Sequence, residues 1–547
     1  MFQGQFMLEQ LEERIVLDGA VADVQDVQDQ TSDANSVDSL GWVYVNDGWW
    51  YEDTGSGWWF NENSGWWWNE NDGWWLKSEN GFDFWYRGEH QYWANEISTG
   101  LWFWWDDIDE QYWEPAFKWF ADQINSEWTW VYNDWNGTFY QTNIEHYYYE
   151  DHATGDRWQW NSLSSIWKPI PSLVADINAG DYNSFPEYMT VYNGQLYFAA
   201  DGDSHGEELW RYDSATNTVS LVADLYAGYI DSDPHELTVY NGELYFAADR
   251  GLYETELWKY NSVSNTLTFV ADIHPNYGSN PQFLTVYNGA LYFAATDGVH
   301  GNELWKYDST SNTASLVADI RPNSDSDPAH LTVYNGQLYF IANDGTHGDS
   351  LWRYDSASNV TTLVTDHLWR GGGLIVYHNQ LYFSAYDAGP YWKYDLWRYD
   401  SVSGSVLAAG RNPSFLFPCN LTVCNDQLYF QATGALGDEL WKYDWVTQSA
   451  SLVADIYPGD GHSNPGSSDY WQGMVEYRGQ LYFPADDGAH GIELWKYDPQ
   501  SNTATLVYDL REGMYGSYLL HLVVYDDELY FCAYDDIHGR ELWKYHA

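Results

Sequence analysis

Cysteine is scarce in this sequence, and the few that occur exclude one class of protein. Three are present in 547 residues, Cys419, Cys424 and Cys532, so a disulfide-bonded secreted scaffold is excluded. Cys419 and Cys424 fall in one expected strand, roughly 16 Å apart, which is too far for a bond between them. We therefore expect all three to be small buried side chains.

Positive charge is also scarce, with 22 Lys and Arg against 81 Asp and Glu and a formal net charge of −59. Such a surface repels nucleic acid and anionic lipid, so we expect neither as a partner. It attracts divalent cations or suits a salty medium, although solubility alone would also explain it. No apolar run approaches the ~18–20 residues of a membrane helix, so no membrane insertion is expected.

The N-terminal segment lacks the cationic start of a standard signal peptide. Residues 11–20 read LEERIVLDGA and resemble the LEPR-x-LL segment near the N-terminus of large bacterial surface proteins, with Glu13 in place of Pro and Val16 in place of Leu. The resemblance implies an extracellular or cell-surface bacterial protein. Residues 21–38 are acidic, small and polar, so we expect 1–38 to be a sorting-like segment followed by a flexible linker.

Aromatic residues are abundant instead, and they are unevenly placed. They make up 19% of the chain, and 23 of the 35 Trp lie between residues 40 and 168. Gly-Trp-Trp units separated by polar turn residues repeat between 48 and 75, a spacing that favours short strands joined by tight turns. Over 115–124 the pattern predicts one short helix. We expect 39–168 to be a Trp/Tyr-rich β-hairpin region with that helix.

Adjacent tryptophans in these units point to opposite faces of a strand, so each unit can bury one ring and present the other. Residues 41–51 are also similar to the first half of choline- or cell-wall-binding repeats. Both observations make the paired rings candidate contacts to a glycan or cell wall; the alternative is that they pack together as a core. The candidates are Trp49, Trp50, Trp58, Trp59, Trp66, Trp67, Trp74 and Trp75.

A second repeat fills the rest of the chain. The tripeptide Leu-Tyr-Phe occurs eight times between residues 196 and 531, and a Leu-Trp pair follows each copy. Successive pairs are 44 to 54 residues apart, which is typical of propeller blades. The Trp residues of the pairs are Trp210, Trp258, Trp305, Trp352, Trp397, Trp441, Trp495 and Trp543.

Each repeat predicts four strands, because Asn-Gly hairpin turns and polar loops separate four apolar segments. Continuous apolar runs such as Leu-Tyr-Phe-Ala-Ala indicate strands buried on both faces. The first recognisable strand, 172–176, is a fourth strand, and the last, 541–545, is a third. The N-terminal strand can therefore complete the last blade and close the ring. We predict an all-β fold in which 171–547 form an eight-bladed β-propeller of four-stranded blades, with a linear solenoid as the second choice.

The repeat resembles known families. Glu303-Leu304-Trp305, the Leu-Val-Ala-Asp-Ile at 316–320 and the Asn-Gly-Gln-Leu-Tyr-Phe at 335–340 resemble the ELWxxDGT repeat of bacterial extracellular proteins and, in outline, kelch repeats. This sequence departs from the family at 307–309, where Tyr-Asp-Ser replaces Asp-Gly-Thr. The resemblance implies an extracellular propeller but no particular activity.

Two kinds of residue are candidates for a site on the propeller. Asp-Gly-x-His-Gly loops recur on one face, but a residue repeated in most blades usually belongs to the turn itself; these histidines are His205, His300, His347, His490 and, more loosely, His538. Acidic pairs offer oxygen ligands suited to calcium, the one cofactor we consider. They are Asp201 with Asp203, Asp231 with Asp233, and Asp325 with Asp327.

No nucleophile elbow, zincin, P-loop or dinucleotide-binding motif is present. We therefore predict no catalytic residue and a secreted or cell-surface, non-enzymatic interaction protein. Its propeller would be a rigid display scaffold, and its partners polysaccharide, cell wall or other surface proteins. The alternative is a glycan-degrading enzyme, hydrolase or lyase, that uses the central face of the propeller. Paired carboxylates for glycoside chemistry stay open, because 81 acids make chance pairs inevitable. Near-uniform repeats favour the first, and the irregular segments 369–373, 391–393 and 467–471 are the best places for a specific site.

Overall fold

The computed structural model describes the strands between residues 36 and 151, and then residues 156–547 apart from 162–165, 180–181, 203, 227, 252–253, 367–372, 388–392, 410–415 and 467–472. The chain divides into two compact units, 1–149 and 150–547, and each is described by itself. The described residues contain no helix, and hence none that is long and apolar enough to cross a membrane. The helix predicted over 115–124 and the segment 11–20 lie outside the described residues.

Aromatic strands joined in sequence order build two antiparallel sheets ahead of the propeller, as the Gly-Trp-Trp spacing predicts. One contains β1 (Ser36–Val37), β2 (Trp42–Asn46), β3 (Trp49–Glu52), β4 (Trp58–Asn61), β5 (Trp66–Asn69), β6 (Trp75–Glu79), β7 (Phe82–Arg87), β8 (Gln91–Glu96) and β9 (Trp102–Asp106). The other contains β10 (Trp130–Asn133), β11 (Gly137–Gln141), β12 (Tyr147–Asp151), β13 (Arg157–Asn161) and β14 (Ile166–Ile170).

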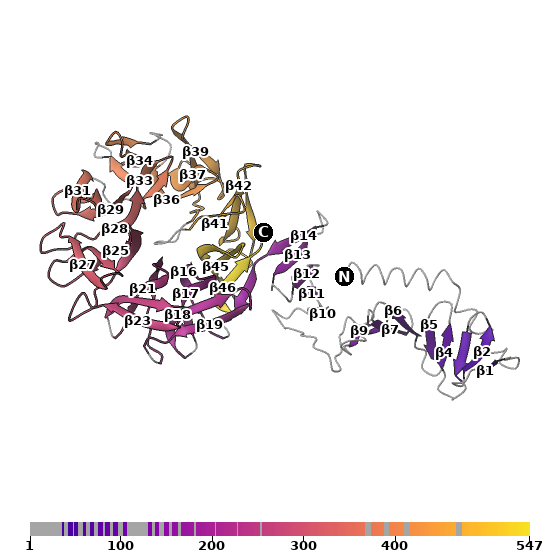
Figure 1. The fold of residues 1–547 in the computed structure, drawn as a ribbon. Helices are drawn as coiled ribbons and strands as arrows, with labels where there is room; N and C mark the ends of the chain where they lie inside the picture. The colour runs from indigo at the N-terminus through magenta and orange to yellow at the C-terminus, as the bar shows by residue number, and fades with distance from the viewer. Residues whose placement is uncertain are drawn as a thin grey trace. The chain divides into compact units, whose positions relative to one another are not determined.

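Eight four-stranded antiparallel sheets follow and form the blades of a propeller (Figure 1), which confirms the predicted fold. Blades 1 to 4 are β16 (Glu187–Tyr192), β17 (Gln195–Gly202), β18 (Gly206–Asp213) and β19 (Thr218–Ala223); β20 (His235–Tyr240), β21 (Glu243–Asp249), β22 (Thr255–Asn261) and β23 (Thr266–Ala271); β24 (Gln282–Tyr287), β25 (Ala290–Thr296), β26 (Asn302–Asp308) and β27 (Thr313–Ala318); and β28 (Ala329–Tyr334), β29 (Gln337–Asn343), β30 (Asp349–Asp355) and β31 (Val360–Thr365). Blades 5 to 8 are β32 (Ile375–Tyr377), β33 (Gln380–Asp387), β34 (Lys393–Asp400) and β35 (Ser405–Ala408); β36 (Leu416–Cys424), β37 (Gln427–Gly434), β38 (Gly437–Asp444) and β39 (Ser449–Ala454); β40 (Val475–Tyr477), β41 (Gln480–Asp486), β42 (Ile492–Asp498) and β43 (Thr503–Tyr508); and β44 (Leu520–Tyr525), β45 (Glu528–Asp535), β46 (Gly539–Tyr545) and β15 (Ser172–Ala175).

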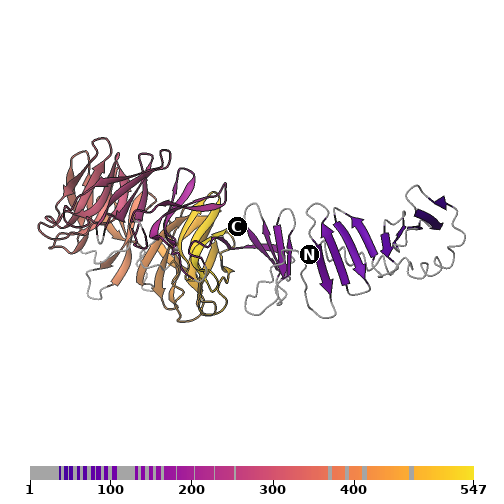
Figure 2. The same cartoon turned by 90° about the horizontal axis from the view of Figure 1, so that it is seen from below.

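The two ends of the repeat region meet in blade 8. β15 pairs antiparallel with β46, Leu173 opposite Trp543 and Ala175 opposite Leu542, with a bulge between the two pairs. The first strands of the blades lie innermost, and β44 contacts β16 as β16 contacts β20. Figure 2 shows the ring of blades from below. The N-terminal strand therefore closes the ring as predicted, and a linear solenoid is excluded.

The core lies between neighbouring blades. Leu196, Tyr197 and Phe198 are 0% exposed, and the Leu-Tyr-Phe residues of the other blades are buried in the same way. A strand with a blade on either side is covered on both faces, which explains the continuous apolar runs. Cys424 and Cys532 are buried and Cys419 is half-buried, and all three are free thiols.

The glutamate of each Glu-Leu-Trp ties its blade to the linker that leads to the next one. In Glu303, Oε2 accepts hydrogen bonds from the Ile320 N–H (2.8 Å) and the Ser326 hydroxyl (2.6 Å). In blade 8 the Glu541 carboxylate accepts from the Ile177 N–H (3.0 Å) and the Ser184 hydroxyl (2.5 Å), so this contact also closes the ring. We call this set the glutamate clamp: Glu208, Glu256, Glu303, Glu439, Glu493 and Glu541, each hydrogen-bonded to a linker serine.

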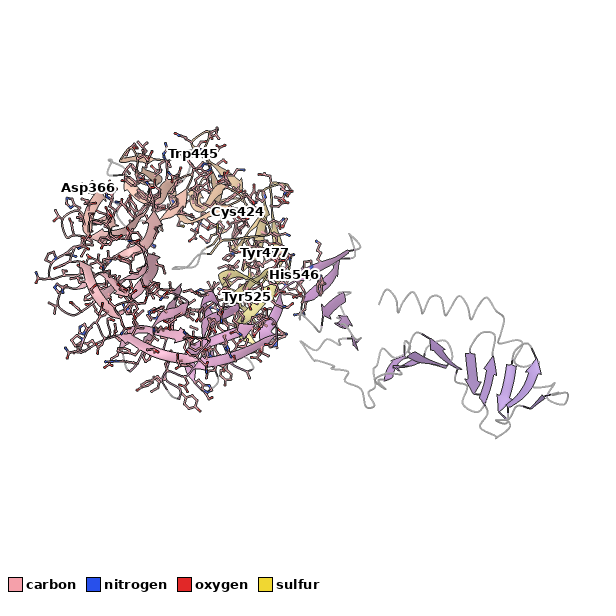
Figure 3. All side chains as sticks on the ribbon, viewed as in Figure 1. Asp366, Cys424, Trp445, Tyr477, Tyr525 and His546 are labelled. Atoms are coloured by element: carbon pink, nitrogen blue, oxygen red, sulfur yellow. The ribbon has the colours of Figure 1, made fainter. Side chains whose placement is uncertain are left out.

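A second inter-blade contact repeats at the opposite face, where the innermost strands end. The Tyr240 hydroxyl donates to the Gly289 carbonyl in the hairpin turn of the next blade (2.8 Å), and the Tyr525 hydroxyl donates to Gly194 across the closing seam (2.7 Å). Figure 3 labels Tyr477 and Tyr525, two of these tyrosines on neighbouring blades. Six of the eight innermost strands are thus tied to a neighbour at both ends. The strands of blades 5 and 6 follow blades whose clamp position holds Ser350 and Asp395, and in blade 6 Cys424 also takes the place of the tyrosine.

We expect ring closure to govern propeller stability. Deleting residues 171–177 removes β15 and the Ile177 partner of Glu541, which opens blade 8 and exposes two strand edges. The melting temperature measured by circular dichroism should fall by several degrees. A chain lacking only residues 1–149 keeps β15 and should retain the propeller transition, whereas an unchanged melting temperature after the 171–177 deletion would show that closure is dispensable.

Stability should also fall as pH rises, because of the glutamate clamp. Burial raises the pKa of four clamp glutamates to about 7 from an ordinary 4.5, and hydrogen bonds from serine and backbone N–H groups offset part of that rise; they are Glu208, Glu256, Glu493 and Glu541. The folded state holds protons that the unfolded chain releases, so this stabilisation is complete below about pH 4.5 and is lost as pH rises through 7.

The melting temperature should therefore drop between pH 5 and pH 8 in 0.5 M salt, which screens the general repulsion among acids. Glu256→Gln mimics the protonated acid permanently and should make the drop shallower. A melting temperature that is flat or rises over this interval would contradict the role of the clamp.

Candidate functional site

The repeats differ from one another mainly on one face, where the linkers arrive and the innermost strands begin; we call it the entry face. The Leu-Tyr-Phe core is the same in all eight blades. The residue just before the Leu-Thr-Val of the innermost strand is different in nearly every blade. In blade order it is Tyr188, Glu236, Phe283, His330, Gly373, Asn420, Gly473 and His521. Variation in an otherwise uniform ring indicates that this face carries the specific site.

A recurring bulge holds these residues. In blade 1 the pairing of β16 with β17 skips from Glu187 to Thr190, and Tyr188 between them has a φ of 53°. Five other members of the set have φ between 54° and 59°. Bulges of this kind bend a strand and re-aim a side chain, and they are common beside active sites.

A group of acidic side chains lies where blade 1 meets blade 2, and we call it the acid cluster: Glu187, Glu207, Asp231 and Asp233. Glu207 is the second residue of β18. Its N–H donates to Asp231 Oδ1 (2.9 Å), and its carbonyl accepts from the Ser232 N–H (3.0 Å). Burial, together with the negative charges of Asp233 and Glu187, raises the pKa of Glu207 to about 8. Glu207 is therefore a neutral acid at pH 7 among carboxylates, the arrangement that general acid catalysis needs.

Tyr188 joins the acid cluster to two histidines. Burial raises the pKa of its phenol, and the neighbouring acidic side chains act in the same direction, those of Glu187, Asp233, Glu236 and Glu207. Its ring centroid lies 5.8 Å from that of His235 and 6.1 Å from that of His521. His521 Nε2 is 3.8 Å from Glu187 Oε1. The acid cluster and its neighbours thus bring together a protonated acid, carboxylates, a phenol and two imidazoles from blades 8, 1 and 2.

Exposed aromatic side chains lie on the same face as the acid cluster. Among the described residues, every exposed Tyr or Phe lies on the entry face, in a linker or at the start of an innermost strand. They are Tyr182, Phe185, Tyr229, Tyr277, Phe417, Tyr515 and Tyr518. The exposed rings in the linkers on either side of blades 8 and 1 indicate a surface that receives a ligand, whereas Phe417 lies in blade 6, away from them.

The histidines of the Asp-Gly-x-His-Gly loops have a turn role. His300 Nδ1 lies 2.6 Å from Asp297 Oδ2, and the other oxygen of Asp297 accepts the N–H groups of Val299 and His300. His347, His490 and His538 repeat this contact at 2.7–2.8 Å. His205 lies instead 3.2 Å from the Ser204 hydroxyl.

The predicted calcium ligands fall into two groups. Asp201, Asp231 and Asp233 border the acid cluster and act on Glu207, and Asp203 lies outside the described residues. Asp325 Oδ1 accepts the Asn302 N–H (2.8 Å), and Asp327 Oδ1 accepts the Asn302 amide (3.1 Å), so both brace the seam between blades 3 and 4. Calcium at these pairs stays a prediction.

In the described part of the chain, one set of three potential metal-ligating side chains converges, and it lies away from the predicted calcium pairs. The set is Asp156, Glu528 and His546, whose ligand atoms lie within 4.8 Å of one another. Lys544 Nζ lies 2.8 Å from Asp156 and 3.3 Å from Glu528. A buried cation of the protein itself already neutralises these carboxylates.

The candidate tryptophans lie on or next to β3 to β6, and their side chains are outside the described part of the structure, as is Trp74 altogether. The irregular segments fall there too, apart from Gly373 and the backbone of Lys393. Sequence analysis did not single out Glu187, Tyr188, Glu207 or His521. A comparison of the repeats position by position would have pointed to Glu207, whose equivalents are Thr255, Asn302, Asp349, Tyr394, Asp438, Ile492 and Arg540.

No protein-family model and no curated protein sequence matches this chain. Solved structures of similar fold include a prolyl endopeptidase (11% identity over 66% of this chain and 56% of that chain, TM-score 0.45). A computationally designed protein, Ika8, is similar (12% identity, 67% of this chain and 98% of that chain, TM-score 0.44), as is a puromycin-hydrolysing peptidase of Mycobacterium tuberculosis (9% identity, 64% and 57%, TM-score 0.41). This chain spans little more than half of each peptidase, and likeness at this level concerns the fold alone.

The prediction of a non-enzymatic display scaffold is wrong, while glycan or cell-wall contacts at the paired tryptophans stay a prediction. The natural proteins among these similar structures are enzymes, a prolyl endopeptidase and puromycin hydrolases. Uniform repeats were a misleading signal, because the uniformity belongs to the core and the entry face is where the blades diverge. Any activity of this chain has to be argued from the residues of the entry face.

Proposed function

We propose that this protein is a glycan hydrolase that acts at its entry face, with Glu207 as the general acid. The observation that carries the proposal is a neutral Glu207 beside the carboxylates of Glu187 and Asp233. Glycoside hydrolysis uses such a pair: the acid protonates the leaving oxygen, and a carboxylate activates water or attacks the sugar. Glu207 supplies the proton, and Glu187 or Asp233 supplies the carboxylate.

Electrostatics favour hydrolysis of a neutral chain over elimination in an acidic one. Lyases act on uronate sugars, whose carboxylates would approach a protein of net charge −59 at a cluster of further carboxylates. A neutral glycan meets no such repulsion. The exposed aromatic rings of the entry face suit its C–H faces, and acidic side chains accept its hydroxyls.

Two further residues have supporting roles. Tyr188 stays protonated among the carboxylates and can donate a hydrogen bond to a sugar hydroxyl or to an ionised neighbour. His521 lies beside Tyr188, and its Nε2 is 3.8 Å from Glu187 Oε1, which places it to interact with that carboxylate from blade 8. An extracellular bacterial location, implied by residues 11–20, agrees with a polymeric substrate and is part of the proposal.

Glu207→Gln should lower kcat on a neutral polysaccharide by at least about 100-fold, because the amide cannot donate the proton. The matched control is Glu254→Gln, which removes a carboxylate from the neighbouring blade that pairs with Arg250 outside the acid cluster. Reducing-end release measures both. Full activity in Glu207→Gln would show that this residue is not the acid.

The pH dependence offers an independent check. Activity should fall as pH rises through about 8, where Glu207 loses its proton. Asp231→Asn keeps a hydrogen-bond acceptor for the Glu207 N–H but removes a nearby negative charge that raises the Glu207 pKa. The falling limb of kcat/KM should then move to lower pH; a limb that stays in place or moves up would point to a different titrating group.

A further inference from the structure

A residue with left-handed backbone recurs in the described linkers just before the innermost strands, and three blades, 1, 6 and 8, fill this place with an aromatic residue. Blades 2, 3 and 4 have Asp233, Asn280 and Asp327 there, with φ of 46° to 48°. Asp and Asn tolerate this conformation because their short side chains bond locally. In blades 1 and 8 the same place holds Phe185 (φ 46°) and Tyr518 (φ 50°), bulky residues for which left-handed backbone is strained.

Burial does not offset this strain. Phe185 is 39% exposed and Tyr518 is 45% exposed, so each ring presents much of its surface to water. The repeat itself shows that Asp or Asn would satisfy the backbone at these two places. Strain retained where a simpler residue would serve is typical of functional sites.

Arg540 lies between the two rings. It occupies the repeat position of Glu207, one blade earlier. Its guanidinium carbon is 5.2 Å from the centroid of Phe185 and 5.9 Å from that of Tyr518. Among the described residues its guanidinium has no carboxylate partner, although the chain contains 81 acids. Two aromatic faces therefore hold a cation whose hydrogen-bond donors are available to a ligand.

We infer that Phe185, Tyr518 and Arg540 form a sugar-binding subsite for a neutral pyranose chain, at the seam between blades 8 and 1. A pyranose stacks its C–H face on an exposed ring while Arg540 donates hydrogen bonds to its hydroxyls. The inference rests on the proposed function, because this seam and the acid cluster flank the same blade. His521 connects the subsite with the acid cluster: it follows Tyr518 by three residues, and the centroid of the His521 ring lies 6.1 Å from that of Tyr188.

Blade 6 provides a control within the same molecule. Phe417 occupies the equivalent place, with a φ of 54° and 50% exposure. Its neighbour at the Arg540 position is Tyr394, and their ring centroids lie 5.0 Å apart. This pair has the strain and the exposure but lacks the cation, and it is distant in the ring from the acid cluster. A subsite role predicts that Phe417 is dispensable for binding.

The test measures binding to the full chain carrying Glu207→Gln, which prevents turnover. Cellohexaose, laminarihexaose and chitohexaose are titrated calorimetrically, with hexagalacturonate as the anionic comparison. At least one neutral hexasaccharide should bind with a Kd below 1 mM. Adding Phe185→Asn or Tyr518→Asn should raise that Kd at least 10-fold while the melting temperature holds or rises, because Asn suits the left-handed backbone. Adding Phe417→Asn should leave the Kd unchanged.

Three results would overturn the subsite. They are no binding of any neutral hexasaccharide, an unchanged Kd after Phe185→Asn, and preferred binding of hexagalacturonate. The outcome is separable from that of the proposed function. If the Glu207→Gln chain retains activity, the acid assignment fails, yet a raised KM with unchanged kcat in Phe185→Asn still supports the subsite.

Discussion

A buried glutamate that reaches from one blade to the linker of the next is the contact on which this structure depends. It accepts hydrogen bonds from two kinds of donor, backbone N–H groups of the linker and a serine hydroxyl. Buried carboxylates are costly unless their lone pairs are used, so each clamp specifies where its linker must lie. Glu541 makes the same contact to Ile177 and Ser184, more than 350 residues earlier in sequence, and thereby closes the ring.

The clamp also places the candidate site. Glu207 and Glu208 are consecutive residues of β18, and alternation along a strand sends their side chains to opposite faces. Glu208 holds the linker to blade 2, while Glu207 lies at the acid cluster beside that same linker. Burial raises the pKa of both side chains, that of Glu208 in a structural contact and that of Glu207 at the proposed catalytic site. The pH dependence of stability and that of activity therefore share one physical cause.

The repeated residues and the variable residues of the ring have different roles. Core and turn residues recur because every seam has the same geometry to fill. The entry face is free of that requirement, so it can carry an acid cluster at one seam and an arginine between aromatic rings at the next. Left-handed Phe185 and Tyr518, and carboxylates crowded around Glu207, both cost stability. An eight-bladed core with tied seams can tolerate those costs.

The sequence by itself determined the ring. Periodic Leu-Tyr-Phe and Leu-Trp segments specify eight four-stranded blades, and an unmatched fourth strand at one end with an unmatched third at the other implies closure, because both are local patterns that burial enforces. Tertiary structure alone decided the site. Glu207, Asp233, Tyr188 and His521 are separated by up to 333 residues, and only closure brings blade 8 against blade 1. The acidic pairs suggested by sequence spacing include Asp231 with Asp233 beside Glu207, but also Asp325 with Asp327, which brace another seam, so spacing alone does not select the site. Burial beside other carboxylates raises the pKa of Glu207, and that environment exists only in the folded ring.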